Sequence, residues 1–312
     1  MKTIVTLTMN PAIDKSSKVD HVIAERKLYC QTPCFEPGGG GINVTRAIKK
    51  LGGESIAFYL SGGPTGEMLQ YLFKQENLDH RPILFDGWTR ENLIVLEEST
   101  GQQYRFGMPG PPISEPEWQQ CLHELSAFGH RIDFIVASGS LPQGVPDSFY
   151  ASVARIGKSR GARVIVDASG EALRLALNEG VYLIKPNIRE FRELSGAGLE
   201  DNLEIEHMAM DIARKGKCGV VVVSLGAAGV LMASDDGHEY IQPPPVPIIS
   251  KVGAGDSMVA GIVLSLARGN PPRDAVRFGV AAGTAAVMTS GTELCRREDT
   301  ERLYRQLTLK SA

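Results

Sequence analysis

A short glycine turn that ends in a carboxylate, Gly253-Ala-Gly-Asp256, carries the most definite chemistry in this sequence. An apolar helical pattern follows it directly over Asp256–Ala267. Because glycine has no Cβ, main-chain N–H groups of this turn can approach an anion, and the helix N-terminus adds partial positive charge. Asp256 could accept the proton of an attacking hydroxyl, while the turn formed by Gly253, Ala254 and Gly255 stabilises a transferred phosphoryl group. The alternative is that Asp256 only caps the helix.

A second glycine cluster, Gly38–Gly41, precedes Asn43 and a helical pattern over Asn43–Leu51. Glycines such as Gly39 let backbone amides approach a small polar ligand, and Asn43 offers both a donor and an acceptor. The alternative is a flexible hinge in which Asn43 caps the helix. Ordering four glycines costs considerable chain entropy, so an ordered run without a use would be surprising.

The segment Lys185-Pro-Asn187 follows an expected strand, and Glu190 lies three residues further on. At this spacing the amide and the carboxylate share one side of a first helical turn and could order water around Mg²⁺ near nucleotide phosphates. The same spacing is typical of a capping box, in which the two side chains only close the helix. Ser224 and Gly226 end another expected strand, at the edge where a nucleotide could bind.

Other residues could hold a phosphorylated sugar. Lys27, Arg90 and Arg105 could bind a phosphate group, and Arg is suited to bidentate contact, although a single surface cation is more often solvated. Asp14 follows the first expected strand and could hydrogen-bond to sugar hydroxyls, with an ordinary turn carboxylate as the alternative. Ser140 follows the expected strand Ile132–Ala137.

Composition excludes several classes of protein. The 312 residues are 43% apolar and 22% charged, which is ordinary globular usage. The 33 Lys and Arg against 36 Asp and Glu give a net charge of −3 without a long basic run, which argues against a nucleic-acid partner. No apolar run approaches the ~20 residues that span a bilayer, so we expect no membrane partner. Neither a Walker loop nor a Gly-x-Gly-x-x-Gly turn after a strand is present, which disfavours P-loop and dinucleotide-binding folds.

The N-terminus has no signal-peptide pattern and is expected to form the first strand. The cysteines are odd in number and scattered along the chain, which favours reduced thiols and a cytoplasmic location over a disulfide framework. They are Cys30, Cys34, Cys121, Cys218 and Cys295.

Short β-branched runs alternate with helical patterns along most of the chain. The expected strands are Ile4–Thr8, Ser55–Leu60, Ile132–Ala137, Arg163–Asp167, Tyr182–Lys185, Val220–Ser224 and Gly229–Ala233. The expected helices are Asn43–Leu51, Gly66–Gln75, Glu115–Leu125, Asp147–Ser159, Ile205–Lys215, Asp256–Ala267, Arg273–Met288 and Thr300–Leu307. Several strands are continuously apolar, which indicates burial on both faces. These patterns predict an α/β fold with a doubly wound, mostly parallel sheet flanked by helices, in which ligands bind at the carboxyl ends of the strands.

Two segments, approximately 14–35 and 88–106, are strand-like but have little helical periodicity. Together they could form a small second sheet. This sheet could act as a lid over the site, or it could be a β-meander that only decorates the core.

Four motifs occur here in a familiar order: Asn10-Pro-Ala-Ile-Asp14, Gly38-Gly-Gly-Gly-Ile-Asn43, Lys185-Pro-Asn187 with Glu190, and Gly253-Ala-Gly-Asp256-Ser257. As a set they resemble the PfkB (ribokinase-like) carbohydrate kinases over nearly the whole chain. The resemblance implies a single ribokinase-like kinase domain over residues 1–312, with the β-sheet lid inserted within it.

The chain is most similar to the 6-phosphofructokinase branch of that family, through segments such as Trp88-Thr-Arg90, Pro243-Pro-Pro-Val246 and Arg277-Phe-Gly-Val-Ala-Ala-Gly283. This similarity implies ATP-dependent phosphorylation of fructose 6-phosphate to fructose 1,6-bisphosphate. The alternatives are a 1-phosphofructokinase or a tagatose-6-phosphate kinase, in which a Lys usually stands at the position of Gly40. A non-catalytic sugar-phosphate or nucleotide sensor is a third hypothesis, against which the retained Asp256 argues.

The resemblance also implies a role for each matching residue. Asp256 would be the base, beside an anion hole formed by Gly253, Ala254 and Gly255. Asp14, Gly39 and Asn43 would hold the sugar, and Lys27, Arg90, Arg105 and Ser140 its phosphate. Lys185, Asn187, Ser224 and Gly226 would contact ATP, and Glu190 would organise Mg²⁺. Carbonyls near Ser250, Val252 and Gly291 resemble the family's K⁺ site, and the family's lid implies a homodimer.

Overall fold

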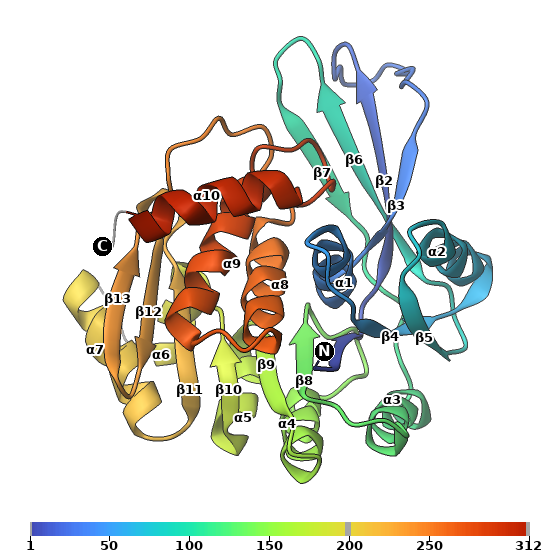
Figure 1. Cartoon of the computed structure of the whole chain (residues 1–312). Coiled ribbons are helices and arrows are strands. Elements are labelled where there is room, and N and C mark those ends of the chain that lie inside the picture. The colour runs from blue at the N-terminus through green and yellow to red at the C-terminus, as the bar shows by residue number, and fades with distance from the viewer. Residues whose placement is uncertain (1, 197–200, 310–312) are drawn as a thin grey trace.

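The computed structural model describes residues 2–196 and 201–309. Its main sheet has nine strands in the order β13-β12-β11-β10-β9-β8-β1-β4-β5 (Figure 1). These strands are β1 (Ile4–Thr8), β4 (Ile56–Ser61), β5 (Asp79–Leu84), β8 (Phe134–Ser138), β9 (Arg163–Asp167), β10 (Val181–Ile184), β11 (Cys218–Ser224), β12 (Val230–Ser234) and β13 (Gly237–Ile241). All neighbours pair in parallel except β12, which is antiparallel to both β11 and β13. The predicted doubly wound, mostly parallel sheet is therefore confirmed.

Helices cover both faces of this sheet. They are α1 (Gly40–Lys50), α2 (Gly63–Gln75), α3 (Glu115–Ala127), α4 (Phe149–Ser159), α5 (Gly170–Glu179), α6 (Ile188–Ser195), α7 (Asn202–Arg214), α8 (Ala254–Ala267), α9 (Pro272–Ala286) and α10 (Arg297–Leu309), with a 3₁₀ turn over Gly226–Ala228. Every predicted strand and helix is present, with bounds that differ by no more than about three residues. None of the described helices combines the length and apolar character that a bilayer-spanning segment needs.

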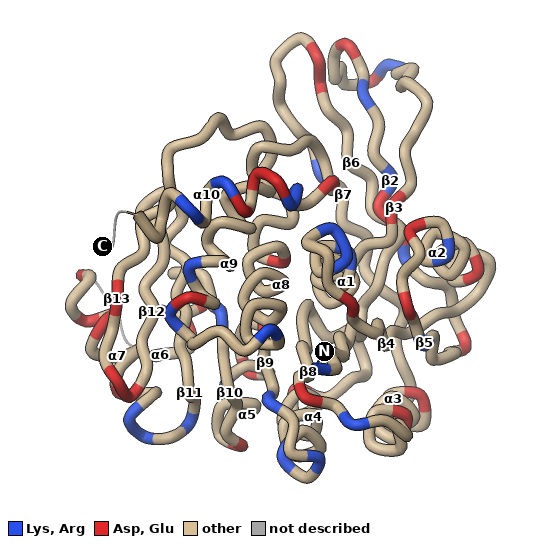
Figure 2. The backbone as a smooth tube through the Cα atoms, viewed as in Figure 1, with Lys and Arg blue, Asp and Glu red and all other residues tan. Residues whose placement is uncertain are grey.

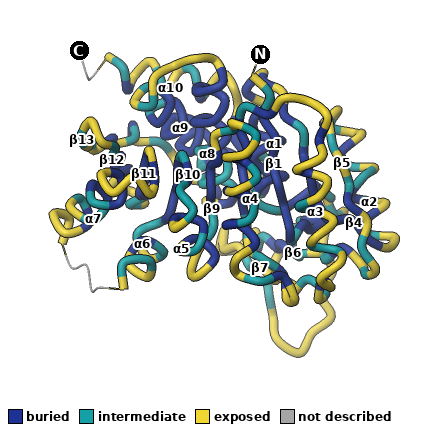
Figure 3. The backbone as a smooth tube through the Cα atoms, turned by 90° about the horizontal axis from the view of Figure 1, so that it is seen from below, coloured by how far each residue is buried: buried dark blue, intermediate teal, exposed yellow. Residues whose placement is uncertain are grey.

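The central strands are buried (Figure 3). Because successive side chains of a strand point to opposite faces, this burial extends to both faces of the sheet. In β1, for example, Val5 packs into the core beneath α3–α7, whereas Ile4 packs into the core beneath α8–α10. Burial on both sides explains why these strands are continuous apolar runs without a polar face.

The two strand-like segments form a separate four-stranded sheet in the order β3-β2-β6-β7. Its strands are β2 (Ala12–Val19), β3 (Cys34–Gly38), β6 (Arg90–Glu97) and β7 (Gln103–Gly107). The predicted second sheet is confirmed, although its strands begin and end slightly outside the expected segments. It projects from one edge of the main sheet beside α1 and α2 (Figure 1).

Lys and Arg are interspersed with Asp and Glu over the helices and loops (Figure 2), in keeping with the small net charge. Two strands and two helices were not among the predicted elements: β5, β13, α5 and α6. Both strands are sheet edges with polar sequences (Asp79-His-Arg-Pro-Ile-Leu84 and Gly237-His-Glu-Tyr-Ile241), so they lack the apolar run of a central strand.

Candidate active site

Four polar residues lie at the carboxyl ends of the parallel strands, and two of them, Lys185 and Ser224, were singled out from the sequence. Ser138 ends β8, Asp167 ends β9, Lys185 follows β10 and Ser224 ends β11. The N-terminus of α8 faces the same edge, as expected for a ligand site in an open parallel sheet.

Asp256 and Asn43 meet across this edge although they are 213 residues apart. The side-chain amide of Asn43 donates a 2.9 Å hydrogen bond from Nδ2 to Oδ2 of Asp256. Asp256 lies in the first turn of α8, and the first helical hydrogen bond runs from Ser257 N to Gly253 O. The amides of Ala254, Gly255 and Asp256 therefore have no partner within the helix and can receive an anion.

Gly253 makes this turn possible. It precedes α8 in the left-handed conformation, with φ 71°, which L-residues with a side chain rarely adopt. A Cβ at this position would also collide with the side chain of Leu294. The turn is thus fixed by backbone conformation and by packing against the loop over residues 290–294.

A buried ion pair lies behind the same turn. The ammonium Nζ of Lys185 is 3.2 Å from Oδ1 of Asp167, and it would be 3.3 Å from a Cβ built on Gly255. Burial by itself lowers the pKa of Lys185, but the nearby Asp167 and Asp256 carboxylates raise it above its ordinary value. Lys185 is therefore a fixed positive charge beneath the glycine turn at the start of α8.

The pKa of Asp256 is raised from 3.8 to about 6, mainly by burial and then by the charge of Asp167. The hydrogen bond from Asn43 and the charge of Lys185 oppose this rise. A carboxylate with this pKa is ionised at neutral pH and is a better proton acceptor than an ordinary Asp. The arrangement therefore places a carboxylate that can accept a proton beside the unpaired amides at the start of α8.

The glycine run before α1 is held tightly by its neighbours. Gly39 has φ 113°, and a Cβ there would lie 2.8 Å from Cγ2 of Thr8. At Gly41, a Cβ would lie 2.6 Å from Oγ1 of Thr8. These positions have no room for a side chain, so the structure favours a rigid turn over the flexible-hinge alternative.

Asp14 lies against this run, and its carboxylate leaves no space for a Cβ on Gly38. Asn92 of β6 donates a 2.8 Å hydrogen bond from Nδ2 to Oδ1 of Asp14. Burial raises the pKa of Asp14, against the opposing effects of Asn92, Arg46 and Arg90. Oδ1 of Asn43 is buried without a hydrogen-bond partner, which leaves an acceptor for a ligand hydroxyl.

Arg90 and Ser140 are brought together by Asn10. Nη2 of Arg90 donates to the carbonyl of Asn10 at 3.1 Å, and Nδ2 of Asn10 donates to Oγ of Ser140 at 3.1 Å. By contrast, Lys27 is exposed on the loop between β2 and β3, with its ammonium 5.0 Å from the ring centre of Tyr29. Arg105 is exposed on β7. Within the described chain, neither of these two cations contacts Arg90 or Ser140.

The residues assigned to a nucleotide form a second group. Asn187 pairs with Ser224 in an isolated parallel bridge, and Gly226 follows with φ +63°. Asn187 and Glu190 make both hydrogen bonds of a capping box, at 2.9 and 3.0 Å. This local role is compatible with a Mg²⁺ role for Glu190, because Mg²⁺ takes only one or two carboxylates and otherwise binds water and phosphate.

Ser250, Val252 and Gly291, the residues expected to hold a monovalent cation, lie close together. The hydroxyl of Ser250 donates to the carbonyl of Gly291 at 3.4 Å and accepts from the amide of Val252 at 3.2 Å. In the described chain no three His, Cys, Asp or Glu side chains cluster as ligands for a metal ion. Any cation here would therefore be held mainly by backbone oxygens.

Sequence reasoning did not assign roles to Asp167, Asn10 or Asn92. Asp167 carried a usable signal, because it ends an expected strand at the edge where ligands bind. Asn92 reaches Asp14 through the parallel pairing of β2 with β6, which no local pattern indicates.

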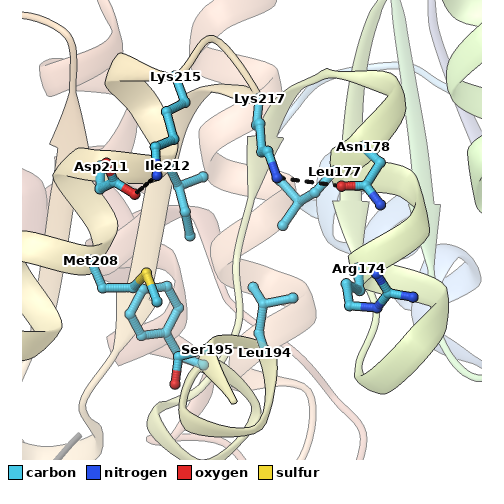
Figure 4. Close-up of a pocket in the computed structure, with 11 residues that line it drawn as sticks. Arg174, Leu177, Asn178, Leu194, Ser195, Met208, Asp211, Ile212, Lys215 and Lys217 are labelled. Atoms are coloured by element: carbon cyan, nitrogen blue, oxygen red, sulfur yellow. Dashed lines mark hydrogen bonds and ion pairs between the residues drawn. The ribbon is translucent and has the colours of Figure 1, made fainter. Parts of the chain in front are cut away.

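A cavity of about 220 Å³ lies elsewhere, between α5, α6 and α7 (Figure 4). Leu177, Phe191 and Met208 form part of its apolar wall. None of the residues assigned from the sequence lines it, so it is separate from the chemistry described above.

Residues 3–299 match the model of the pfkB family carbohydrate kinases. The chain is 42% identical over 309 residues to the ATP-dependent 6-phosphofructokinase isozyme 2 of Escherichia coli, covering 99% of this chain and 100% of that protein. It is 31% identical over 292 residues to the 1-phosphofructokinase of Bacillus subtilis, covering 93% and 95% respectively. The crystal structure of Escherichia coli phosphofructokinase-2 in complex with fructose 6-phosphate superposes with a TM-score of 0.92 at 41% identity, over 99% of this chain and 100% of that one.

Replacing Asp256 with Asn should stabilise the protein at neutral pH. Between the ordinary pKa of 3.8 and the folded value of about 6, the folded state binds a proton that the unfolded state has lost. Wild-type stability therefore falls as the pH rises through this range, whereas the variant does not titrate. Allowing for solvent around a partly exposed carboxylate, we expect the variant to be more stable by about 2 kcal/mol above pH 6 and equal to wild type below about pH 4.

Urea unfolding of both proteins across this pH range measures the difference. A free-energy difference that does not vary with pH would contradict the raised pKa of Asp256.

Proposed function

Because this chain belongs to the pfkB family of carbohydrate kinases, we propose that it is an ATP-dependent 6-phosphofructokinase. The reaction is in-line attack of the 1-hydroxyl of fructose 6-phosphate on the γ-phosphorus of ATP. A bond forms between the sugar oxygen and phosphorus, the bond from phosphorus to the β,γ-bridging oxygen breaks, and the hydroxyl proton passes to Asp256. The products are fructose 1,6-bisphosphate and ADP.

The observation that carries this proposal is the Asn43–Asp256 hydrogen bond. This bond places the Asp256 carboxylate and the three unpaired amides at the start of α8 beside Asn43. Asn43 follows the rigid glycine turn, and its Oδ1 is an acceptor without a partner. Phosphoryl transfer depends mainly on positioning and on electrostatic stabilisation of the moving charge, and these groups supply both. The fixed charge of Lys185 adds to the stabilisation from behind the turn.

On the sugar side, Asp14, Gly39 and Asn43 hold the hydroxyl groups, and Arg90 and Ser140 bind the 6-phosphate. Arg90 is suited to this role because its guanidinium is partly buried and already oriented by Asn10. Lys27 and Arg105 are exposed in the isolated chain and do not reach this site. We therefore propose that they bind the 6-phosphate only when the lid closes or a second copy of the chain is bound.

On the nucleotide side, Asn187, Ser224 and Gly226 contact ATP. Glu190 helps hold Mg²⁺, which neutralises phosphate charge when bound. The carbonyls of Ser250, Val252 and Gly291 would hold K⁺, a hard cation that suits oxygen ligands.

The four-stranded sheet is the lid of this single kinase domain, and it pairs with a second copy to form a homodimer. Exposed apolar side chains support this arrangement: Tyr29, on the loop between β2 and β3, is 78% exposed, and Phe106, on β7, is 47% exposed. Large exposed apolar groups are typical of interfaces, and pairing would cover the open edges of the sheet. Closure of the lid would keep water from the transferred phosphoryl group.

A coupled assay of ADP release tests the substrate. We expect kcat/KM for fructose 6-phosphate to exceed that for fructose 1-phosphate or tagatose 6-phosphate by at least about tenfold, because buried polar groups discriminate strongly against a misplaced hydroxyl or phosphate. The higher identity to a 6-phosphofructokinase than to a 1-phosphofructokinase supports this order. A preference for fructose 1-phosphate would contradict the proposal. Nucleotide binding without turnover of any of these sugars would favour the alternative of a non-catalytic sensor.

Replacing Asp256 with Asn tests the base. We expect kcat to fall by about 10²- to 10⁴-fold, because the attacking hydroxyl loses its proton acceptor, while the Kd for ATP changes by less than about threefold. Steady-state kinetics and calorimetric titration measure the two quantities. Asp211→Asn is the matched control. It removes the exposed ion pair between Asp211 of α7 and Lys215, and it should leave kcat and the Kd for ATP unchanged. Near wild-type turnover of the Asp256 variant would show that another group is the base.

A further inference from the structure

Arg46 is an almost fully buried cation that the proposed chemistry does not use. It lies on α1, one turn after Asn43, and is only 2% exposed. A buried guanidinium is costly unless its N–H groups find partners. Arg46 meets this condition by contacting three separate parts of the chain.

The first contact is with α2. Nε of Arg46 donates to both carboxylate oxygens of Glu76, at 3.0 and 2.9 Å, and Glu76 follows the last residue of α2. The second is with β3, where Nη2 donates to Glu36 at 2.7 Å and Nη1 to the carbonyl of Pro37 at 3.3 Å. Pro37 immediately precedes the glycine run, so this contact lies at the root of the sugar-binding turn.

The third contact is with the loop over residues 290–294. Nη1 of Arg46 donates to the carbonyl of Thr292 at 3.2 Å, and the hydroxyl of Thr292 donates to Glu36. This loop continues to Leu294, whose side chain packs against Gly253 at the start of the anion-binding turn. One side chain therefore touches the supports of both turns.

We propose that Arg46 is a positioning residue that fixes the sugar-binding turn relative to the anion-binding turn, by tying β3 and α2 to the loop behind Gly253. It acts through its neighbours and touches no substrate. This proposal rests on the proposed function for its kinetic consequences, but not for its structural ones.

Lysine is the informative replacement at this position. Arg46→Lys keeps a positive charge between Glu36 and Glu76, so it avoids leaving two partly buried carboxylates without a cation. Its single ammonium group offers three donors from one atom, and it cannot span α2, β3 and the 290–294 loop together. Thr292→Val is a second, nearly isosteric variant, which removes only the hydroxyl contact to Glu36.

Arg160→Lys provides the matched control. Arg160 also donates to several carbonyls, those of Ser126, Phe128 and His130, and so joins the end of α4 to one segment after α3, remote from the site. Its replacement should lower the urea midpoint without changing catalysis.

Kinetics of the folded proteins provide the first test. For Arg46→Lys we expect kcat to fall by about 10- to 100-fold, as for small misplacements of reacting groups, with the Kd for ATP within about threefold of wild type. For Thr292→Val we expect a smaller fall in kcat. For the double variant we expect the fold-decrease in kcat to be less than the product of the two single fold-decreases, because both substitutions act on Glu36. An unchanged kcat for Arg46→Lys would overturn the proposal and leave a purely structural role.

Amide hydrogen exchange provides a test that needs no activity. In Arg46→Lys, exchange should speed up together in residues 34–43 and in residues 287–296, and in neither segment in Arg160→Lys. Faster exchange in only one of the two segments would show that Arg46 does not link them. If the wild-type protein fails to phosphorylate fructose 6-phosphate, the proposed function fails while this experiment still decides the role of Arg46.

Discussion

A single hydrogen bond between two distant turns organises this molecule: Nδ2 of Asn43 to Oδ2 of Asp256, at 2.9 Å. Each partner sits at the start of a helix, beside glycines that bring the backbone close to the space between them. The carboxylate is crowded enough for its pKa to rise to about 6, yet Asn43 and Lys185 keep it ionised at neutral pH. A proton acceptor thus stands next to unpaired amides, which is the minimum that phosphoryl transfer to an alcohol requires.

The rest of the fold serves to hold these two turns in place. The parallel sheet delivers Asp167, Lys185 and Ser224 to one edge, and apolar cores on both faces make that edge rigid. The small sheet places Asp14 against the glycine run and Arg90 beside Asn10. Beneath the site, the buried Arg46 joins the segments that support each turn. Its hydrogen bonds connect α2 and β3 to the loop over residues 290–294.

The sequence was most informative where chemistry and local structure coincide. The Gly253–Asp256 turn and the Gly38–Asn43 run each combine a backbone requirement with a reactive or polar side chain, and each leads into a helix, as predicted. Asn187 and Glu190 form the capping box that was the alternative to a ligand role, and the two roles are compatible. The edge strands β5 and β13 escaped prediction because partly exposed strands need no apolar run.

Contacts set by long-range pairing could not be foreseen. Asn92 reaches Asp14 only because β2 and β6 pair in parallel, and Asn10 links Arg90 to Ser140 across separate loops. Nothing in the local pattern distinguishes Arg46, since its partners come from three different segments that only the fold brings together. Residue type indicates what a side chain can do, whereas its partners depend on the register and packing of the whole fold.

A crystal structure with fructose 6-phosphate and a non-hydrolysable ATP analogue tests the central claim most directly. The account predicts the sugar 1-hydroxyl within about 3 Å of the Asp256 carboxylate, and the terminal phosphate of the analogue facing the amides of residues 254–256. A sugar bound away from Asn43 and Asp256, or a terminal phosphate directed away from the start of α8, would contradict it.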